Sequence, residues 1–182
     1  KIQKKKLNKN KIFWISKIDK LEKIPSIFIA NEFFDSIPIK QFEKKNGLWF
    51  EKFVTFKDSK RGEFFKKKID IKKIEKKIDF KISQNQNFIE YSNIGLAYLK
   101  KISQIIKENY GGLLLIDYGY TDKKMRNTLQ AISKHKFANI LDDIGCVDIT
   151  HNINFELFRK YTDQKGNLKN NITTQKNFLI KM

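Results

Sequence analysis

The chain has 182 residues, of which 40% are hydrophobic and 13% aromatic, and it carries a formal net charge of +18. This length and composition predict a single folded domain over residues 1–182. They exclude an unfolded chain that is too polar to form a hydrophobic core. The lone Cys146 excludes an intramolecular disulfide, and His135 and His151 are too few to predict a metal site.

The positive charge allows two interpretations, a surface that binds nucleic acid or a solvated lysine surface. Only Arg61, Arg126 and Arg159 carry the guanidinium that phosphate clamps and groove readers favour, and the lysines are spread along the whole chain. We therefore predict no specific nucleic-acid partner. A nucleic-acid-binding module stays open as a third alternative, besides an enzyme and a scaffold. No apolar run comes near the roughly 20 residues that span a bilayer, so no membrane span is predicted.

The stretch 27–41 organises the rest of the chain. The apolar run 27–30 predicts a strand buried on both faces, and Asn31, Glu32 and Asp35 follow it directly. In an open α/β sheet, ligands bind beyond the carboxyl ends of the strands, so these polar side chains are candidates for a site. The alternative is that Asn31 and Glu32 only cap the next segment.

A hairpin is predicted over 39–56, because Asn46-Gly47 separates two runs of strand-forming residues and both residues accept positive φ. The lysine-rich segment 64–80 has no clear period and is not assigned. A short strand or turn over 88–91 carries Glu90.

Apolar residues recur at helical spacing over 94–106, and Asn109 with Gly111-Gly112 predicts the end of this helix. A second buried strand follows over 112–116 and ends in Asp117. Gly119 is free to take a backbone conformation that is closed to other residues. Two strands that both end in an acid indicate one edge of a parallel sheet and favour a shared site there.

The remainder of the chain is predicted in outline. An element begins over 128–137, a strand follows over 146–153, and Asn154 is a candidate N-cap for a helix over 155–161. The tail, 172–182, has the pattern of a strand or a short helix.

Five words of the sequence, taken in order and spacing, resemble one family. They are NEFFDSIPIKQF (31–42), LLLIDYG (113–119), TLQAISKHKF (128–137), DIT (148–150) and TTQKNFL (173–179). The chain is similar to the S-adenosylmethionine-dependent methyltransferases of the mitochondrial complex I assembly factor family, whose bacterial and amoebal relatives are called MidA-like. The most specific word is 31–35 followed by Pro38, and the next is 117–119.

The resemblance implies an α/β, class I (Rossmann-like) methyltransferase fold, a mostly parallel sheet with a β-hairpin insertion. It also implies S-adenosyl-L-methionine as cofactor and methylation of arginine on a protein partner, a core subunit of respiratory complex I in mitochondrial members. The compartment would be a bacterial cytoplasm or a mitochondrial matrix. The glycine-rich cofactor loop of the family would lie before residue 1, and the chain begins without methionine. We therefore expect a C-terminal portion that binds cofactor poorly and is inactive alone.

Arginine methylation needs acids near the methyl group, because a carboxylate pair orients the guanidinium and helps to remove its proton. Our hypothesis gives this catalytic role to Glu32 and Asp35, with Asn31 and Phe33 on the cofactor side. For Phe33 and Phe34 the alternative is packing in the core.

The substrate side is assigned to Asp117, Tyr118, His135 and His151. Each has a structural alternative: Asp117 could hold the end of its strand, and the histidines could be hydrogen-bonded packing residues. The DIT word could be a local turn. A different class of function also stays open, a non-catalytic assembly chaperone or scaffold that presents its hairpin to a partner.

Overall fold

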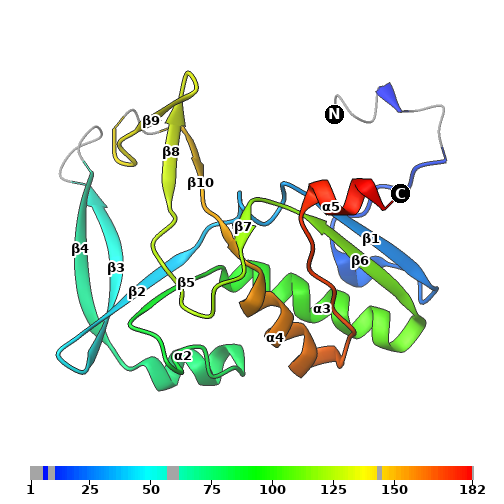
Figure 1. Ribbon diagram of the computed structural model, residues 1–182, viewed down its shortest axis with the longest axis horizontal. Helices are drawn as coiled ribbons and strands as arrows, with labels where there is room; N and C mark the ends of the chain where they lie inside the picture. The colour runs from blue at the N-terminus through cyan, green and yellow to red at the C-terminus, as the bar shows by residue number, and fades with distance from the viewer. Residues whose placement is uncertain (1–5, 8–10, 57–61, 143–144, 182) are drawn as a thin grey trace.

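The computed structural model of the chain describes residues 6–7, 11–56, 62–142 and 145–181 (Figure 1). Its elements are η1 (Ile18–Lys20), β1 (Ser26–Asn31), β2 (Lys40–Lys45), β3 (Leu48–Phe56), β4 (Gly62–Ile69), α2 (Ile71–Ile78), β5 (Phe88–Tyr91), α3 (Asn93–Asn109), β6 (Gly111–Ile116), β7 (Gly119–Tyr120), β8 (Gln130–Ser133), β9 (Lys136–Ala138), β10 (Asp148–Thr150), β11 (Ile153–Asn154), α4 (Phe155–Gly166) and α5 (Gln175–Ile180).

Strands β1 and β6 pair in parallel, with Ser26 opposite Gly111 and Asn31 opposite Ile116. This pairing confirms that the two apolar runs are neighbours in one parallel sheet. The prediction of burial on both faces is wrong, since Ile27 is 80% exposed and Ile29 is 70% exposed. Side chains alternate along a strand, and α3 covers only the opposite face among the described residues.

Two glycines permit close approaches of the backbone. A Cβ on Gly111 would lie 1.9 Å from the carbonyl oxygen of Ser26, and its φ of +132° suits glycine. Gly119 does not use the freedom of glycine to take a positive φ. A Cβ on Gly119 would instead lie 2.4 Å from the carbonyl oxygen of Ile153, because β11 pairs in parallel with β7 at this point.

The predicted hairpin is confirmed as β2 and β3, with Asn46 at φ 49° and Gly47 at φ 77° between them. It belongs to a four-stranded antiparallel sheet in the order β4-β3-β2-β5, which forms one side of the molecule (Figure 1). The unassigned lysine-rich segment divides into β4 and α2, and Asp70 caps α2 by accepting a hydrogen bond from the Lys72 backbone N–H.

The later elements agree with the predictions in type and differ in length. The helix over 94–106 is α3, and the helix capped by Asn154 is α4, with the Leu157 N–H donating to Asn154 at 2.8 Å. The strand expected over 146–153 is shorter and forms two pieces, β10 and β11. The element begun at 128–137 is an antiparallel pair, β8 and β9, and β10 joins β8 in the same sheet.

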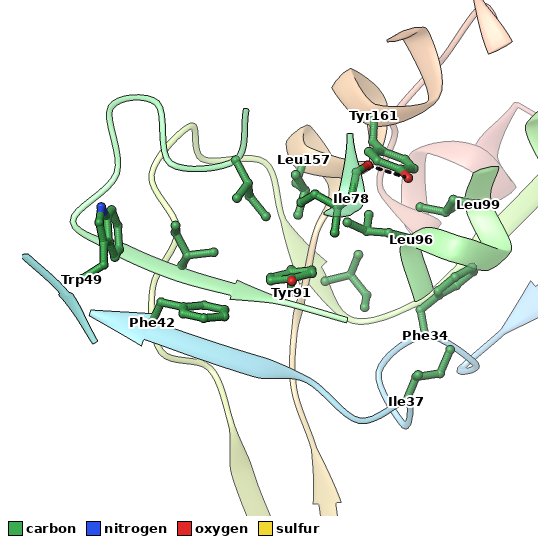
Figure 2. Packing of buried hydrophobic residues seen from close by; sticks show 13 residues of the cluster. Phe34, Ile37, Phe42, Trp49, Ile78, Tyr91, Leu96, Leu99, Leu157 and Tyr161 are labelled. Carbon is green, nitrogen blue, oxygen red and sulfur yellow. Dashed lines mark hydrogen bonds between the residues drawn. The ribbon is translucent and has the colours of Figure 1, made fainter. Parts of the chain in front are cut away.

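The hydrophobic core lies where the antiparallel sheet meets α3 and α4 (Figure 2). Phe42 is fully buried and stacks on Tyr91, with ring centroids 5.9 Å apart. Leu96 and Leu157 approach these rings from the helices, and the Tyr161 hydroxyl donates to the Ile78 carbonyl at 3.5 Å. The antiparallel sheet and the helices are therefore packed as one unit.

Replacing Phe42 by Ala tests this core. The free energy of unfolding should fall by about 3 to 5 kcal/mol, because the substitution removes a buried ring and leaves a cavity beside Tyr91. Phe137→Ala is the matched control, since Phe137 is 81% exposed and its loss should change stability by less than about 0.5 kcal/mol. Urea denaturation measures both, and equal effects would contradict the assigned core.

Candidate functional site

The carboxyl ends of β1 and β6 meet at one point of the molecule. Asn31 lies opposite Ile116 in the parallel register, and the Glu32 N–H donates to the Ile116 carbonyl at 2.9 Å. The residues that follow the two strands, Glu32 and Asp117, are therefore brought together as the sequence predicted. This is the edge at which open α/β sheets bind ligands.

Glu32 has a left-handed backbone conformation and a side chain without a partner among the described residues. Its φ is +44°, in the left-handed region that costs a residue with a Cβ about 1 to 2 kcal/mol. The residue is exposed, and its carboxylate makes no hydrogen bond or ion pair within the described part of the chain. A strained residue with a free acidic group at a strand end is a candidate for function, since such strain persists only where the surroundings enforce it.

Asp117 holds the loop that carries these residues. Its carboxylate accepts hydrogen bonds from the backbone N–H groups of Phe34 at 3.0 Å, Asp35 at 3.3 Å and Tyr118 at 2.9 Å. Burial raises the pKa of Asp117, the negative charge of Asp35 raises it further, and the backbone donors act against both. The geometry is that of the structural alternative, in which Asp117 organises the site through the backbone.

Asp35 is held from the other side by β10 and the residue after it. The Thr150 hydroxyl donates to Asp35 Oδ2 at 3.1 Å, and the His151 N–H donates to the Asp35 carbonyl at 3.3 Å. The other carboxylate oxygen, Oδ1, is buried and has no hydrogen-bond partner among the described residues. The sequence interpretation of DIT as a local turn missed Thr150, because its partner lies 115 positions away in the chain.

The two histidines lie in different places. His151 is buried, and its ring Nε2 lies 3.3 Å from the Ile37 carbonyl, so it packs against the loop after β1. His135 is exposed in the turn between β8 and β9, at φ 61°. That turn lies at the far end of its hairpin from β1 and β6 (Figure 1). The structure thus joins His151 to the candidate site and places His135 away from it.

Asn31 and Phe33 line a small hollow beside α3, with a volume of about 300 Å³. The Phe33 ring makes edge contacts with Tyr98 and Phe34, at centroid distances of 5.5 Å and 5.1 Å. Phe34 is buried in the core, whereas Phe33 is 40% exposed. Core packing therefore explains Phe34, and Phe33 keeps one side open. Tyr118, 63% exposed, lies next to Asp117 directly after the end of β6.

A network of buried polar side chains lies next to the candidate site, and the sequence did not predict it. Glu90 on β5 accepts from Gln41 Nε2 at 2.6 Å and from the Thr128 N–H at 3.2 Å. The Asn152 N–H donates to the Thr128 hydroxyl at 2.9 Å, so the network ends next to His151. Strand patterns do not reveal such contacts, because the partners come from distant elements.

The described residues contain no group of three or more His, Cys, Asp or Glu placed to hold a metal ion. None of the described helices is long and apolar enough to cross a membrane.

The raised pKa of Asp117 predicts a pH dependence of stability. The folded chain holds this proton more tightly than the unfolded chain, so the stabilisation is fully present below the ordinary value of 3.8 and is lost as pH rises through the raised pKa. Wild type should therefore lose stability relative to Asp117→Asn over this range. Urea denaturation at a series of pH values measures the difference. A difference that is independent of pH, or that grows in the opposite direction, would contradict it.

Comparison with known proteins places the chain in a family. Residues 1–173 match the family model described as "Putative S-adenosyl-L-methionine-dependent methyltransferase". Among curated relatives, the chain is 25% identical over 171 residues to the mitochondrial protein arginine methyltransferase NDUFAF7 of Danio rerio, covering 94% of this chain and 40% of that protein. It is 29% identical over 148 residues to the Caenorhabditis elegans homologue, covering 79% of this chain and 34% of that protein.

Solved structures share the fold. An uncharacterized protein from Burkholderia thailandensis aligns with 90% of this chain and 46% of its own, at a TM-score of 0.66 and 18% identity. A second protein from the same organism was solved with bound S-adenosyl-homocysteine. It aligns with 82% of this chain and 40% of its own chain, at a TM-score of 0.61 and 17% identity.

These matches confirm the expected α/β methyltransferase fold and S-adenosyl-L-methionine as the cofactor of the family. The chain spans about 40% of the length of the Danio rerio relative and 34% of the Caenorhabditis elegans one. With a family model that covers nearly all of it, the chain belongs to the family of S-adenosyl-L-methionine-dependent methyltransferases.

Proposed function

We propose that the natural protein containing this chain transfers a methyl group from S-adenosyl-L-methionine to an arginine side chain of a protein substrate. The observation that supports this most is Glu32, an exposed carboxylate without a partner in the described residues, held at a strained position where β1 and β6 end. The mitochondrial relatives named as protein arginine methyltransferases support the choice of acceptor.

The chemistry explains why an acid is needed at this point. S-adenosyl-L-methionine supplies an electrophilic methyl group on a positively charged sulfur. A protonated guanidinium is a poor nucleophile, so Glu32 orients its N–H groups by charge-assisted hydrogen bonds and accepts the proton that is released. Holding the guanidinium nitrogen in line with the methyl group is the other main contribution that a protein makes to such a displacement.

Asp35 is proposed as the second acid. Thr150 donates only to Oδ2, and Oδ1 is a buried acceptor for which the described part of the chain provides no donor. A buried polar atom without a partner costs free energy, so an N–H group that reaches Oδ1 would be bound favourably. A guanidinium carries five such N–H groups and can serve two carboxylates at once.

The hollow beside α3 suits the cofactor side. Asn31 offers an amide that both donates and accepts, and Phe33 offers an aromatic ring with one side open. A ring face attracts a positively charged group such as a sulfonium. We therefore assign Asn31 and Phe33 to contacts with the cofactor when it is bound.

The substrate side is proposed around the end of β6. Tyr118 is exposed there and can contact the substrate directly, whereas Asp117 and His151 act on the loop after β1 through hydrogen bonds. His135 contributes only if the substrate extends to the turn of β8 and β9. A complex I core subunit stays our proposal for the substrate, in a mitochondrial matrix or a bacterial cytoplasm.

A scaffold function without catalysis is the second candidate. Strand β3 of the predicted hairpin and its neighbour β4 expose apolar side chains, with Phe56 54% exposed and Phe65 44% exposed, and Phe65 stacks on Phe53 at 5.4 Å. Exposed apolar groups of this kind are typical of surfaces that contact another protein. An assembly factor could use the hairpin in this way with or without methyl transfer.

Replacing Glu32 by Gln tests the catalytic proposal in the full-length natural protein. Methyl transfer should fall by at least about 100-fold, because the amide cannot accept the proton, while stability should change by less than about 0.5 kcal/mol. A radiolabelled methyl donor and an extract of the source cells measure transfer. Glu22→Gln is the control, an exposed acid outside the site that should leave the rate unchanged. Normal transfer by the Glu32 variant would contradict the catalytic role of Glu32, and absence of transfer by the unaltered full-length protein would favour the scaffold.

Cofactor binding is tested by titration calorimetry with S-adenosyl-homocysteine. The full-length protein should bind it, and the 182-residue chain alone should bind it weakly, because Asn31 and Phe33 provide only part of the contacts that a cofactor of this size needs. No binding by the full-length protein would contradict the proposed enzyme. Equal binding by the chain alone would contradict the expectation that further contacts are needed.

A further inference from the structure

We propose that a second site, the cleft between α2 and α4, binds an acidic segment of a protein partner. The cleft has a volume of about 950 Å³ and is bounded by α2, the loop 79–86, the loop 123–125 and α4. Both helices lie along the lower edge of the molecule (Figure 1). None of Asn31, Glu32, Asp35 and Asp117 lines it, so the cleft is separate from the candidate methyl-transfer site.

The acids of the cleft already have hydrogen-bond or ion-pair partners within the chain. Five lysines and three acids line it, and each acid has a donor of its own. Glu75 accepts from Ser83 at 2.8 Å, Asp79 pairs with Lys165 at 2.5 Å, and Glu156 pairs with Arg159 at 2.9 Å. Among the lysines of the lining, Lys160 pairs with Glu156 at 3.4 Å, so one of the five is compensated within the cleft.

Three of the lysines have no such partner. The ammonium groups of Lys76, Lys81 and Lys123 make no hydrogen bond or ion pair with any described residue, whereas Lys124 donates to the Asn85 carbonyl. Free ammonium groups on the rim of one cleft create a positive potential that attracts a ligand with several negative charges. Side-chain amides such as that of Gln84 add hydrogen-bond donors.

The floor of the cleft is apolar. Ile82 is 2% exposed and Leu157 is 5% exposed, with Phe80 and Met125 half-buried beside them. A ligand with charged groups alone would leave these apolar side chains in contact with water. An acidic peptide with apolar side chains would cover the apolar floor and place its carboxylates near the lysines of the rim. Carboxylates bind to ammonium groups without a bidentate guanidinium, and the cleft lining contains no arginine. Charge complementarity therefore favours an acidic protein segment over nucleic acid.

The walls are held in place before any ligand binds. The Gln86 side chain donates to the Lys123 carbonyl at 2.8 Å and accepts from the Met125 N–H at 2.9 Å, which joins the two loops. Gln164 on α4 donates to the Asp79 carbonyl at the end of α2 at 3.2 Å. Because binding does not have to order these segments, less of the interaction free energy is lost on association.

Fluorescence anisotropy with a labelled peptide of alternating Glu and Leu tests the proposal on the full-length natural protein. Saturable binding is expected, and Lys81→Glu with Lys123→Glu should weaken it by at least about tenfold, because two attractions become repulsions. Lys81→Gln with Lys123→Gln should give a smaller loss. The substitutions should not disturb the fold, because the side chains of Lys81 and Lys123 have no partner among the described residues. Circular dichroism checks that the variants fold. The readout needs no methyl donor, so it is independent of the proposed function.

The matched control is Lys134→Glu with Lys136→Glu, which makes the same change in net charge at the exposed turn of β8 and β9. The control should keep wild-type affinity, and a peptide with Lys in place of Glu should not bind. Equal weakening by the control pair would show attraction by net charge alone and overturn the site. Absence of saturable binding would also overturn it, as would complete displacement of the peptide by a single-stranded oligonucleotide at equal concentration.

Discussion

The candidate site depends on one carboxylate, that of Asp117, which binds the backbone of the loop after β1. Parallel pairing brings the ends of β1 and β6 together, but pairing alone leaves the following loop free to take many conformations. By accepting the N–H groups of Phe34 and Asp35, Asp117 removes that freedom. Glu32 stands between the strand and this fixed loop, which explains how a left-handed backbone is maintained there.

A second set of contacts holds the same loop from the opposite side. Thr150 and His151 bind Asp35, and the buried network of Gln41, Glu90 and Thr128 ends at the neighbouring Asn152. Hydrogen bonds thus run from the antiparallel sheet to the candidate site. Because buried polar groups without partners are costly, such a network favours one arrangement of the elements that it joins. The hairpin insertion is in this way part of the support of the site.

The charge of the chain has more than one structural role. Many lysines are exposed and dispersed, in agreement with a solvated surface. Some complete internal contacts, such as Lys165, which lies against Asp79 at the end of α2, where a positive charge complements the helix dipole. Lys76, Lys81 and Lys123 in the cleft of α2 and α4 lack partners among the described residues, and only their position distinguishes them from the rest. Net charge by itself does not separate these roles.

The sequence by itself determined the local elements and the family: the Asn46-Gly47 turn, helix α3 and its end, the Asn154 cap, and an acid after each of two apolar strands. These follow from propensities and patterns over a few residues. Only the tertiary structure decided which acid is free. Asp117 is occupied by N–H groups 82 and 83 positions away, whereas Glu32 is left exposed. Likewise, the exposure of Ile27 and Ile29 and the role of Thr150 depend on which elements pack against them, and no local pattern contains that information.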